Sequence, residues 1–171
     1  REVEAETMEE LDKALAIALT GAEADEAVAA MRRQVAEWGL VLPDSPPFVC
    51  DFGLGRFGEI GEIETWIANE TVAGYCGKLM FVFDGQTCPL HHHLTKHETF
   101  YIMKGRVRMA AGEEVREMGE GNVLPVAPGV RHSFTGIGPA LLLEVSMPCV
   151  VEDNCFADPA IPIGSGADLP K

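Results

Sequence analysis

Residues 85–98 of the chain read GQTCPLHHHLTKHE, and the fold can be worked out from this stretch. It holds four of the five histidines within seven positions: His91, His92, His93 and His97. Because side chains alternate between the two faces of a β-strand, His91 and His93 are expected on one face and His92 on the other. Glu98 opens the next apolar segment after a short connection. Two imidazoles and a carboxylate converging from adjacent strands are ligands of a divalent transition metal.

The remaining histidine is the expected source of a fourth ligand. His132 follows a turn formed by Pro128 and Gly129 and opens another apolar segment. The predicted metal site therefore comprises four residues: His91, His93, Glu98 and His132. His92 and His97 have the opposite parity on their strands and are expected at the rim or outside the site.

Composition and charge narrow the class of protein. The chain has 171 residues, of which 47% are hydrophobic and 23% charged, as is ordinary for one globular domain. Its formal net charge is −14, which disfavours binding to nucleic acid or to an anionic membrane. No apolar run approaches the roughly 20 residues of a membrane span. Five cysteines without a CxxC pair, and an acidic start without a secretory pattern, favour a reducing, cytoplasmic location.

The hydrophobic pattern changes along the chain. It predicts a first helix over residues 8–19 with Thr7 as its N-cap, and a second helix over about residues 25–38. A proline-rich linker follows at 42–47. Beyond it, short apolar segments at 60–68, 78–83, 99–103, 106–110, 123–126, 132–135 and 140–145 indicate an all-β sandwich or barrel. We expect a helical arm over 1–47 and a β-barrel domain over 48–171, together forming one compact domain.

Two motifs resemble those of the cupin superfamily. Residues 85–105 read G-x5-H-x-H-x4-E-x6-G, which resembles the first cupin motif, and residues 128–132 resemble the second. The resemblance implies a double-stranded β-helix barrel with a metal inside its mouth. With the two α-helices predicted from the hydrophobic pattern, the expected fold is an all-β cupin barrel with two N-terminal α-helices. Small barrels of this kind can enclose one small ligand.

A longer pattern, over about residues 35–161, resembles the D-lyxose isomerase family of cupins, particularly its short bacterial members. The most specific pieces are H-x-H-x2-K-x-E, which ends at Glu98, and the Glu144-Val145-Ser146 segment. The resemblance implies reversible aldose–ketose isomerisation with a sugar as substrate. It also implies a divalent metal cofactor, foremost Mn(II), with Zn, Co, Ni or Fe as alternatives.

Such a reaction needs a base for the carbon-bound proton and an electrophile for the oxygens. Glu144 is the expected base because a carboxylate in the otherwise apolar segment 141–145 is costly without a partner or a task. Lys96 shares the parity of Glu98, and the family spacing indicates that it donates to the developing oxyanion or moves the hydroxyl proton. Lys78, in an apolar strand, is a weaker candidate of the same kind and is expected to bind substrate.

Three further residues are expected to line or close the sugar pocket. They are Gln86, Phe134 and Asp158, because an aromatic face suits the C–H side of a sugar and polar groups suit its hydroxyls. The sugar pair stays open among lyxose/xylulose, mannose/fructose and ribose/ribulose. By analogy with the fold we also expect a homodimer.

Two other functions fit the same four ligands. A cupin dioxygenase or lyase could use Fe(II), although Lys96 and Glu144 would have no evident role there and only Tyr75 and Tyr101 could supply a tyrosine. A sugar-binding cupin without catalysis would bind saccharide without turnover, and its binding would survive Glu144→Gln.

Overall fold

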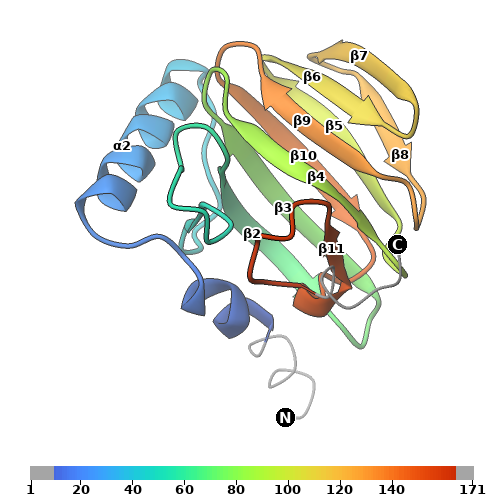
Figure 1. Ribbon diagram of the computed structural model, residues 1–171. Coiled ribbons are helices and arrows are strands. Elements are labelled where there is room, and N and C mark those ends of the chain that lie inside the picture. The colour runs from blue at the N-terminus through green and yellow to red at the C-terminus, as the bar shows by residue number, and fades with distance from the viewer. Residues whose placement is uncertain (1–9, 165–171) are drawn as a thin grey trace.

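Two β-sheets face each other, and a long helix lies against the outside of one of them (Figure 1). The computed structural model describes residues 10–164. The all-β fold with N-terminal helices that the sequence predicts is confirmed. No helix within 10–164 is both long and apolar enough to cross a membrane.

The first sheet has six antiparallel strands, and the second has five. In spatial order the first consists of β1 (Phe48–Cys50), β2 (Glu62–Glu70), β3 (Tyr75–Val82), β10 (Ala140–Ser146), β5 (Glu98–Lys104) and β8 (Val123–Val126). The second consists of β11 (Asn154–Phe156), β4 (Thr87–His93), β9 (His132–Gly136), β6 (Arg106–Ala111) and β7 (Glu114–Gly119).

The space between the sheets holds the main core. The alternation of the strands directs one set of side chains inward from both sheets, among them Ile102, Met109, Phe134 and Leu142, all at most 1% exposed. The rings of Phe100 and Phe134 are 5.8 Å apart, edge to face, and link β5 to β9. This core occupies part of the barrel and leaves the rest for polar side chains.

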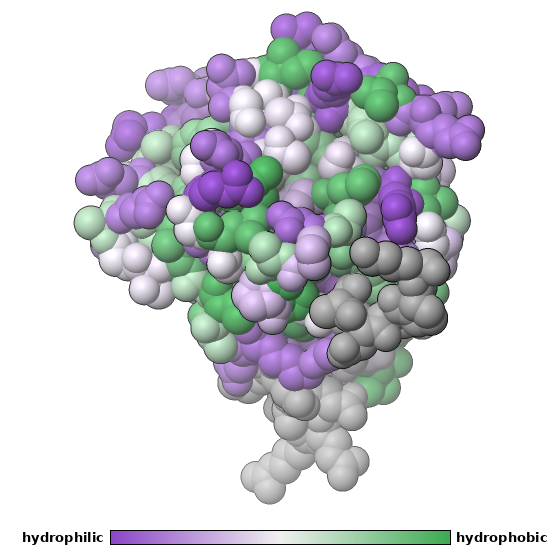
Figure 2. Space-filling view, viewed as in Figure 1, coloured by the Kyte–Doolittle hydropathy of each residue, from purple (hydrophilic) through white to green (hydrophobic). Residues whose placement is uncertain are grey.

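Helix α2 (Ala22–Glu37) covers the outer face of the first sheet. It begins three residues before the predicted start, and Gly39 follows it with a φ of 71°. Its buried stripe includes Met31 and Val35, which pack on sheet residues such as Ile63. Hydrophilic side chains cover its other face (Figure 2). Both faces of β2 are therefore shielded from water near Ile63.

The first predicted helix ends earlier than expected. Residues 10–16 are helical, and the chain then leaves the helix because the amide of Leu19 donates to the carbonyl of Val49 in β1, at 2.8 Å. The N-cap predicted at Thr7 lies outside the described residues. The division at residue 47 into an arm and a barrel stays a prediction.

Most predicted strands are present, with bounds shifted by a few residues. Three strands were not predicted: β1, β7 and β11. Strand β7 pairs along its length with β6 at the edge of the second sheet, and four of its six residues are exposed. Its polar sequence, EVREMG, lacks the apolar alternation that identifies a strand with a buried face.

Candidate metal centre and active site

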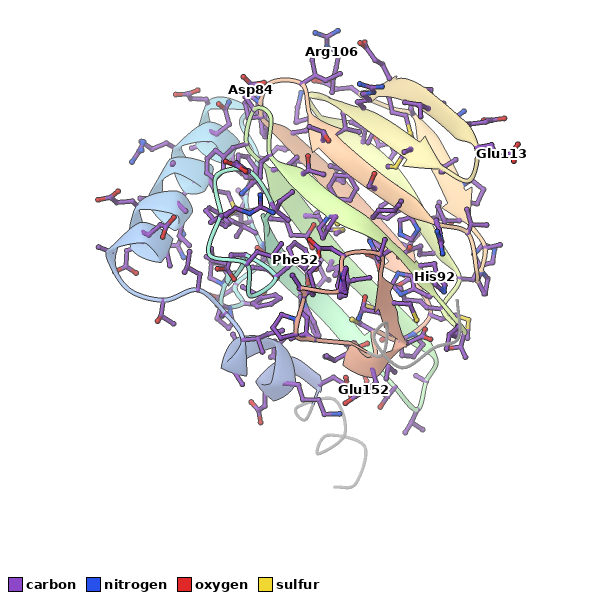
Figure 3. The ribbon with its side chains drawn as sticks, viewed as in Figure 1. Phe52, Asp84, His92, Arg106, Glu113 and Glu152 are labelled. Carbon is purple, nitrogen blue, oxygen red and sulfur yellow. The ribbon has the colours of Figure 1, made fainter. Side chains whose placement is uncertain are left out.

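Four side chains from three strands meet inside the barrel. His91 and His93 lie on the same face of β4, Glu98 opens β5, and His132 opens β9 opposite His91. One potential ligand atom from each lies within 4.8 Å of those of the other three, and all four residues are buried. The fold thus brings together the residues that the sequence indicated. His92, on the other face of β4 (Figure 3), is half-buried and outside this group.

The three imidazoles are fixed by backbone carbonyls. Their Nδ1 atoms lie 2.8 Å from Pro89 O for His91, 3.2 Å from Asp153 O for His93 and 2.9 Å from Val130 O for His132. A carbonyl oxygen only accepts, so each Nδ1 carries the proton and donates. In a neutral imidazole this leaves a lone pair on Nε2, the form that binds a metal.

The buried side-chain atoms of this group that have no hydrogen-bond partner are suited to bind a divalent cation. The Nε2 atoms of His93 and His132 and the Oε1 atom of Glu98 are buried without a hydrogen-bond partner. Yet Glu98 Oε1 lies 2.7 Å from His132 Nε2 and 3.2 Å from His93 Nε2. These short contacts join acceptor atoms, which repel one another unless a cation lies among them. Three imidazole nitrogens and one carboxylate oxygen form a donor set for a first-row transition metal.

The protonation states suit this role. Burial holds the pKa of His91 well below its ordinary 6.5, which keeps the ring neutral and able to act as a ligand. Burial alone would raise the pKa of Glu98, but the Lys96 ammonium, 2.9 Å from Glu98 Oε2, is among the groups that hold that pKa below the ordinary 4.5. Glu98 is therefore a carboxylate.

Lys96 joins the metal centre to Glu144. Its Nζ atom lies 2.9 Å from Glu98 Oε2 and 2.9 Å from Glu144 Oε1, and the three side chains are at most 4% exposed. Burial lowers the pKa of Lys96, but the carboxylates of Glu144 and Glu98 together raise it above its ordinary value, so the ammonium stays charged. Ser146 Oγ also donates to Glu144 Oε1, at 2.8 Å.

Lys78 extends this network to a second acidic group. Its Nζ atom lies 3.0 Å from Glu64 Oε1 and 3.6 Å from Glu144 Oε2. Burial lowers the pKa of Lys78, but Glu144 and Glu64 raise it well above its ordinary value. The two lysines and their three glutamates alternate in charge, which explains how five ionised side chains can be buried together.

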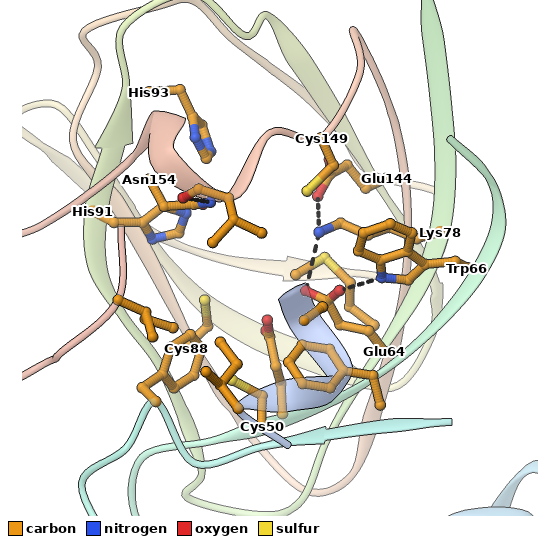
Figure 4. Close-up of a pocket in the computed structure, with 18 of the residues that line it drawn as sticks. Cys50, Glu64, Trp66, Lys78, Cys88, His91, His93, Glu144, Cys149 and Asn154 are labelled. Atoms are coloured by element: carbon orange, nitrogen blue, oxygen red, sulfur yellow. Dashed lines mark hydrogen bonds and ion pairs between the residues drawn. The ribbon is translucent and has the colours of Figure 1, made fainter. Parts of the chain in front are cut away.

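The network lines a pocket between the two sheets (Figure 4). Its cavity is about 60 Å³, several times the ~10–15 Å³ that one water requires on the same measure. Among the lining residues are His91, His93, Lys96, Glu144 and Lys78. The pocket therefore places a small ligand against the metal centre and the lysine–glutamate network together.

Three residues predicted to line the pocket lie elsewhere in the described structure. Gln86 is fully buried, donates to the Phe57 carbonyl and accepts from the Phe83 amide, so it fixes a turn. Phe134 is fully buried in the core between the sheets. Asp158 accepts from the Ala160 amide at 2.9 Å, in a turn. The lining of the pocket includes none of the three. Each was predicted from its residue type, which does not reveal that Gln86 and Asp158 have backbone partners nearby or that Phe134 packs in the core.

Asp153 supports the site and was not predicted. Its carbonyl holds His93 Nδ1, and its carboxylate accepts from the backbone amides of Leu94, Thr95 and Lys96 at 2.9–3.4 Å. It thereby orders the loop between two metal ligands. No sequence signal could indicate this, because Asp153 reaches the loop across 57 to 60 residues of chain.

The pocket also contains residues that the sequence did not indicate, notably Glu62, Glu64 and Trp66 on β2. Phe52, from the loop after β1 (Figure 3), borders the pocket with a φ of 54° and packs edge-on against Phe156, 5.5 Å away. The alternating sequence Glu62-Ile63-Glu64 is typical of a strand whose acidic face meets water. Here α2 covers the Ile63 face, and the acidic face turns inward.

A barrel of two antiparallel sheets with three histidines and one glutamate on its inner strands defines a cupin. The model of the cupin domain family matches residues 78–146. The chain is 30% identical over 142 residues to a D-lyxose ketol-isomerase of Thermofilum sp., in a match that covers 66% of this chain and 77% of the relative. It is 28% identical, with the same coverage, to a D-lyxose/D-mannose isomerase of Thermosediminibacter oceani. The chain therefore belongs to the D-lyxose ketol-isomerase family of cupins.

A solved structure agrees with the fold. The L-ribose isomerase of Cellulomonas parahominis superposes with a TM-score of 0.68 at 17% identity, over 85% of this chain and 95% of that one. At this identity the likeness concerns the fold alone. It extends over most of the chain and so includes elements beyond the matched cupin domain.

Proposed function

We propose that this protein is a metal-dependent aldose–ketose isomerase that interconverts D-lyxose and D-xylulose by proton transfer through an enediolate. D-mannose and L-ribose are the further substrates suggested by the names of its relatives and of the solved structure. The observation that carries the proposal is the position of Lys96, whose ammonium contacts both Glu98 of the metal centre and the carboxylate of Glu144. A base and an electrophile are thus held against one small cavity.

The residues His91, His93, Glu98 and His132 would hold the metal, with Mn(II) as the proposed ion. When bound, the metal supplies Lewis acidity to the substrate oxygens at C1 and C2. Several first-row metals accept this donor set, so metal reconstitution decides among them.

Glu144 is the proposed base. As a carboxylate it takes the proton from C2 of the open-chain aldose and returns it to C1. Lys78, Lys96 and Ser146 hold its two oxygens in place, so the carboxylate needs little reorganisation during the transfer. Lys96, as an ammonium, donates a proton to O1, on which negative charge develops, and takes one back from the O2 hydroxyl, so that it ends the reaction protonated. Apolar side chains elsewhere in the pocket keep competing water away from the carbanion-like carbon.

The proposal extends to assembly and location. On the outer face of the first sheet, Ile67 and Val145 are 55% and 51% exposed, next to Gly77. We propose that this apolar area pairs two copies in a homodimer, which light scattering tests directly, since a monomeric mass would refute it. The buried thiols of Cys50, Cys76, Cys88 and Cys149 suit a reducing cytoplasm.

The alternative enzyme classes lack comparable support. Tyr75 and Tyr101 are 53% and 39% exposed, and neither lines the pocket. The pocket therefore offers no tyrosine for the chemistry of a lyase or oxygenase that uses one. Lys96 and Glu144 have a role in proton transfer and none in those reactions.

The test is isomerisation in heavy water. Protein stripped of metal and reloaded with Mn(II) is incubated with D-lyxose, D-mannose and L-ribose, and the ketose is analysed by NMR and mass spectrometry. Proton transfer through Glu144 predicts deuterium at C1 of the ketose, because a glutamic acid exchanges its proton with solvent. Undiminished formation of ketose by Glu144→Gln would refute proton transfer through Glu144. No ketose from any of the three sugars would refute the isomerase.

A further inference from the structure

Two buried carboxyl groups line the pocket and have no part in the proposed reaction. Glu62 and Glu64 project inward from β2 and are 3% and 6% exposed. Neither belongs to the metal cluster, and neither contacts Lys96. Burying two neighbouring acids is costly, and β2 could have carried apolar residues at both positions without it. The pair therefore calls for a reason outside the packing of the barrel.

The two groups are not equivalent. Glu64 is fully held, because its Oε2 accepts from Trp66 Nε1 at 2.7 Å and its Oε1 from Lys78 at 3.0 Å. Glu62 Oε2, in contrast, is buried without a hydrogen-bond partner. Burial and the adjacent Glu64 raise the pKa of Glu62 well above its ordinary value, whereas Lys78 and hydrogen bonds from Glu62 and Trp66 lower that of Glu64 against the effect of burial. The protonated Glu62 thus donates to the Glu64 carboxylate, and its Oε2 atom is left to accept from a ligand.

Strand register places the pair away from the metal. Trp66, Lys78 and Glu144 form one cross-strand row. Along β2, Glu64 lies one two-residue repeat from that row and Glu62 two repeats, that is roughly 7 and 13 Å along the backbone. Glu62 pairs with Cys50. Figure 4 shows Cys50 at the opposite end of the pocket from His93 and Glu144.

The offset of Glu64 is close to the length of a small sugar, and the carboxyl group of Glu62 adjoins that of Glu64. The four C–C bonds of a linear pentose, each about 1.5 Å, span at most about 6 Å. A pentose with C1 and C2 at the metal and Glu144 would therefore direct its far end towards the side chains of Glu64 and Glu62. The other pocket residues at this end, among them Cys50, Cys88 and Met80, suit the C–H groups of the chain.

We propose that Glu62 and Glu64 form the subsite for the terminal hydroxyl of the sugar, with Glu62 as the residue that recognises the hydroxyl on C5. A hydroxyl can donate to the buried Oε2 atom of Glu62, which has no hydrogen-bond partner. Substrates that lack this hydroxyl leave that oxygen unpaired, which is the strongest form of discrimination available to a buried polar group. The inference rests on the proposed isomerase function and adds the residues that select the sugar.

The test compares two substrates in two proteins. The wild type and Glu62→Met are assayed with D-lyxose and with 5-deoxy-D-lyxose, which lacks only the terminal hydroxyl. We expect the wild type to lose about tenfold in kcat/KM on the deoxy sugar, as for one buried hydrogen bond. Compared with the wild type on the same sugar, Glu62→Met should have a kcat/KM about tenfold lower on D-lyxose and less than about twofold lower on 5-deoxy-D-lyxose. Glu62→Gln, which keeps a donor and an acceptor, should lie between the two proteins.

A matched control separates recognition from stability. Asp51 is another buried acid outside the pocket lining, and its oxygens accept from the amides of Gly53 and Gly55. Asp51→Asn should keep the wild-type ratio between the two sugars. An equal loss on both sugars in Glu62→Met would overturn the subsite, since a structural effect does not depend on the substrate.

A binding measurement keeps the subsite apart from catalysis. D-arabinitol carries the hydroxyls of a pentose and no carbonyl, and Trp66 reports its binding by fluorescence in a Trp38→Phe background. Binding weakened about tenfold by Glu62→Met supports the subsite even if the wild type converts no aldose, a result that would refute only the proposed function. Binding unaffected by Glu62→Met overturns the subsite even if the isomerase is active. No binding and no turnover would overturn both.

Discussion

The buried ammonium of Lys78 gives a quantitative test of the lysine–glutamate network. Lys78→Met keeps most of the length of the side chain and removes its charge. Lys78 is 5% exposed and lies 3.0 Å from Glu64 and 3.6 Å from Glu144, so the variant leaves two buried carboxylates with one fewer cation. We expect a large loss of stability at neutral pH.

The two distances set the scale. With an effective dielectric constant of about 20, they correspond to attractions of about 5.5 and 4.6 kcal/mol. Desolvation of the ammonium offsets much of this, and removing one member of a buried ion pair has a net cost of about 3–5 kcal/mol. For a chain of this length, each kcal/mol lowers the melting temperature by about 2–4 °C, so we expect a decrease of roughly 6–20 °C.

The sign of the pH dependence follows from Glu64. Its pKa in the folded protein is below the ordinary 4.5, because the attraction of Lys78 and hydrogen bonds outweigh burial. The ion pair therefore contributes stability above pH 4.5, and this contribution is lost as the pH falls through the folded pKa. The difference in stability between the wild type and Lys78→Met should be greatest at neutral pH and shrink below about pH 4.5.

Urea unfolding at pH 7 measures both effects in a double-mutant cycle. Glu64→Gln removes the second charge of the pair while keeping an acceptor for Trp66, so Lys78→Met/Glu64→Gln should recover at least half of the stability that Lys78→Met loses. A loss below about 1 kcal/mol in the single variant would contradict the electrostatic reasoning. So would a double variant whose loss equals the sum of the two single losses.

Three further predictions address the base, the metal and the backbone. Glu144→Gln should lower kcat by about 10²–10⁴-fold with unchanged metal content, and a variant keeping a tenth of the activity would argue against Glu144 as the base. His93→Ala should weaken Mn(II) binding in equilibrium dialysis by more than the roughly 10–100-fold typical of losing a supporting residue, whereas unchanged affinity would exclude His93 as a ligand. Gly105 and Gly112 have φ values of 75° and 60°, but a Cβ at Gly105 would collide with the Pro139 carbonyl and one at Gly112 meets nothing within 4 Å. Thermal unfolding should therefore show that Gly105→Ala costs about 1–3 kcal/mol more than Gly112→Ala, and equal losses would contradict the packing argument.

The strands could be predicted where one of their faces is buried. The alternation around residues 99–103 and 140–145 reflects a strand with its inner face in the core, and β5 and β10 lie there. Strand β7 was missed because most of its side chains are exposed and carry no alternation. The end of the first helix was predicted too late, because periodicity does not reveal that the Leu19 amide donates to a carbonyl in β1.

The site residues could also be predicted only in part. Glu144 was indicated by its charge within an apolar segment, and Lys96 by the spacing of the family motif. The structure brings the two together. Gln86, Phe134 and Asp158 were chosen by residue type, and their partners turned out to be nearby backbone or core. Such partners depend on the path of the chain, which residue type does not encode.

The four candidate metal ligands could be predicted from the sequence alone. Three of them lie within eight positions, where the alternation of β-structure alone places His91, His93 and Glu98, and His132 was the remaining histidine. The direction in which the acidic face of β2 points, in contrast, depends on the tertiary structure. Helix α2 covers the Ile63 face, and the acids on the other face, Glu62 among them, are thereby turned into the barrel. A strand with alternating acids exposes them to water when its apolar face is the only buried one, and whether both faces are buried depends on what the rest of the chain packs against it.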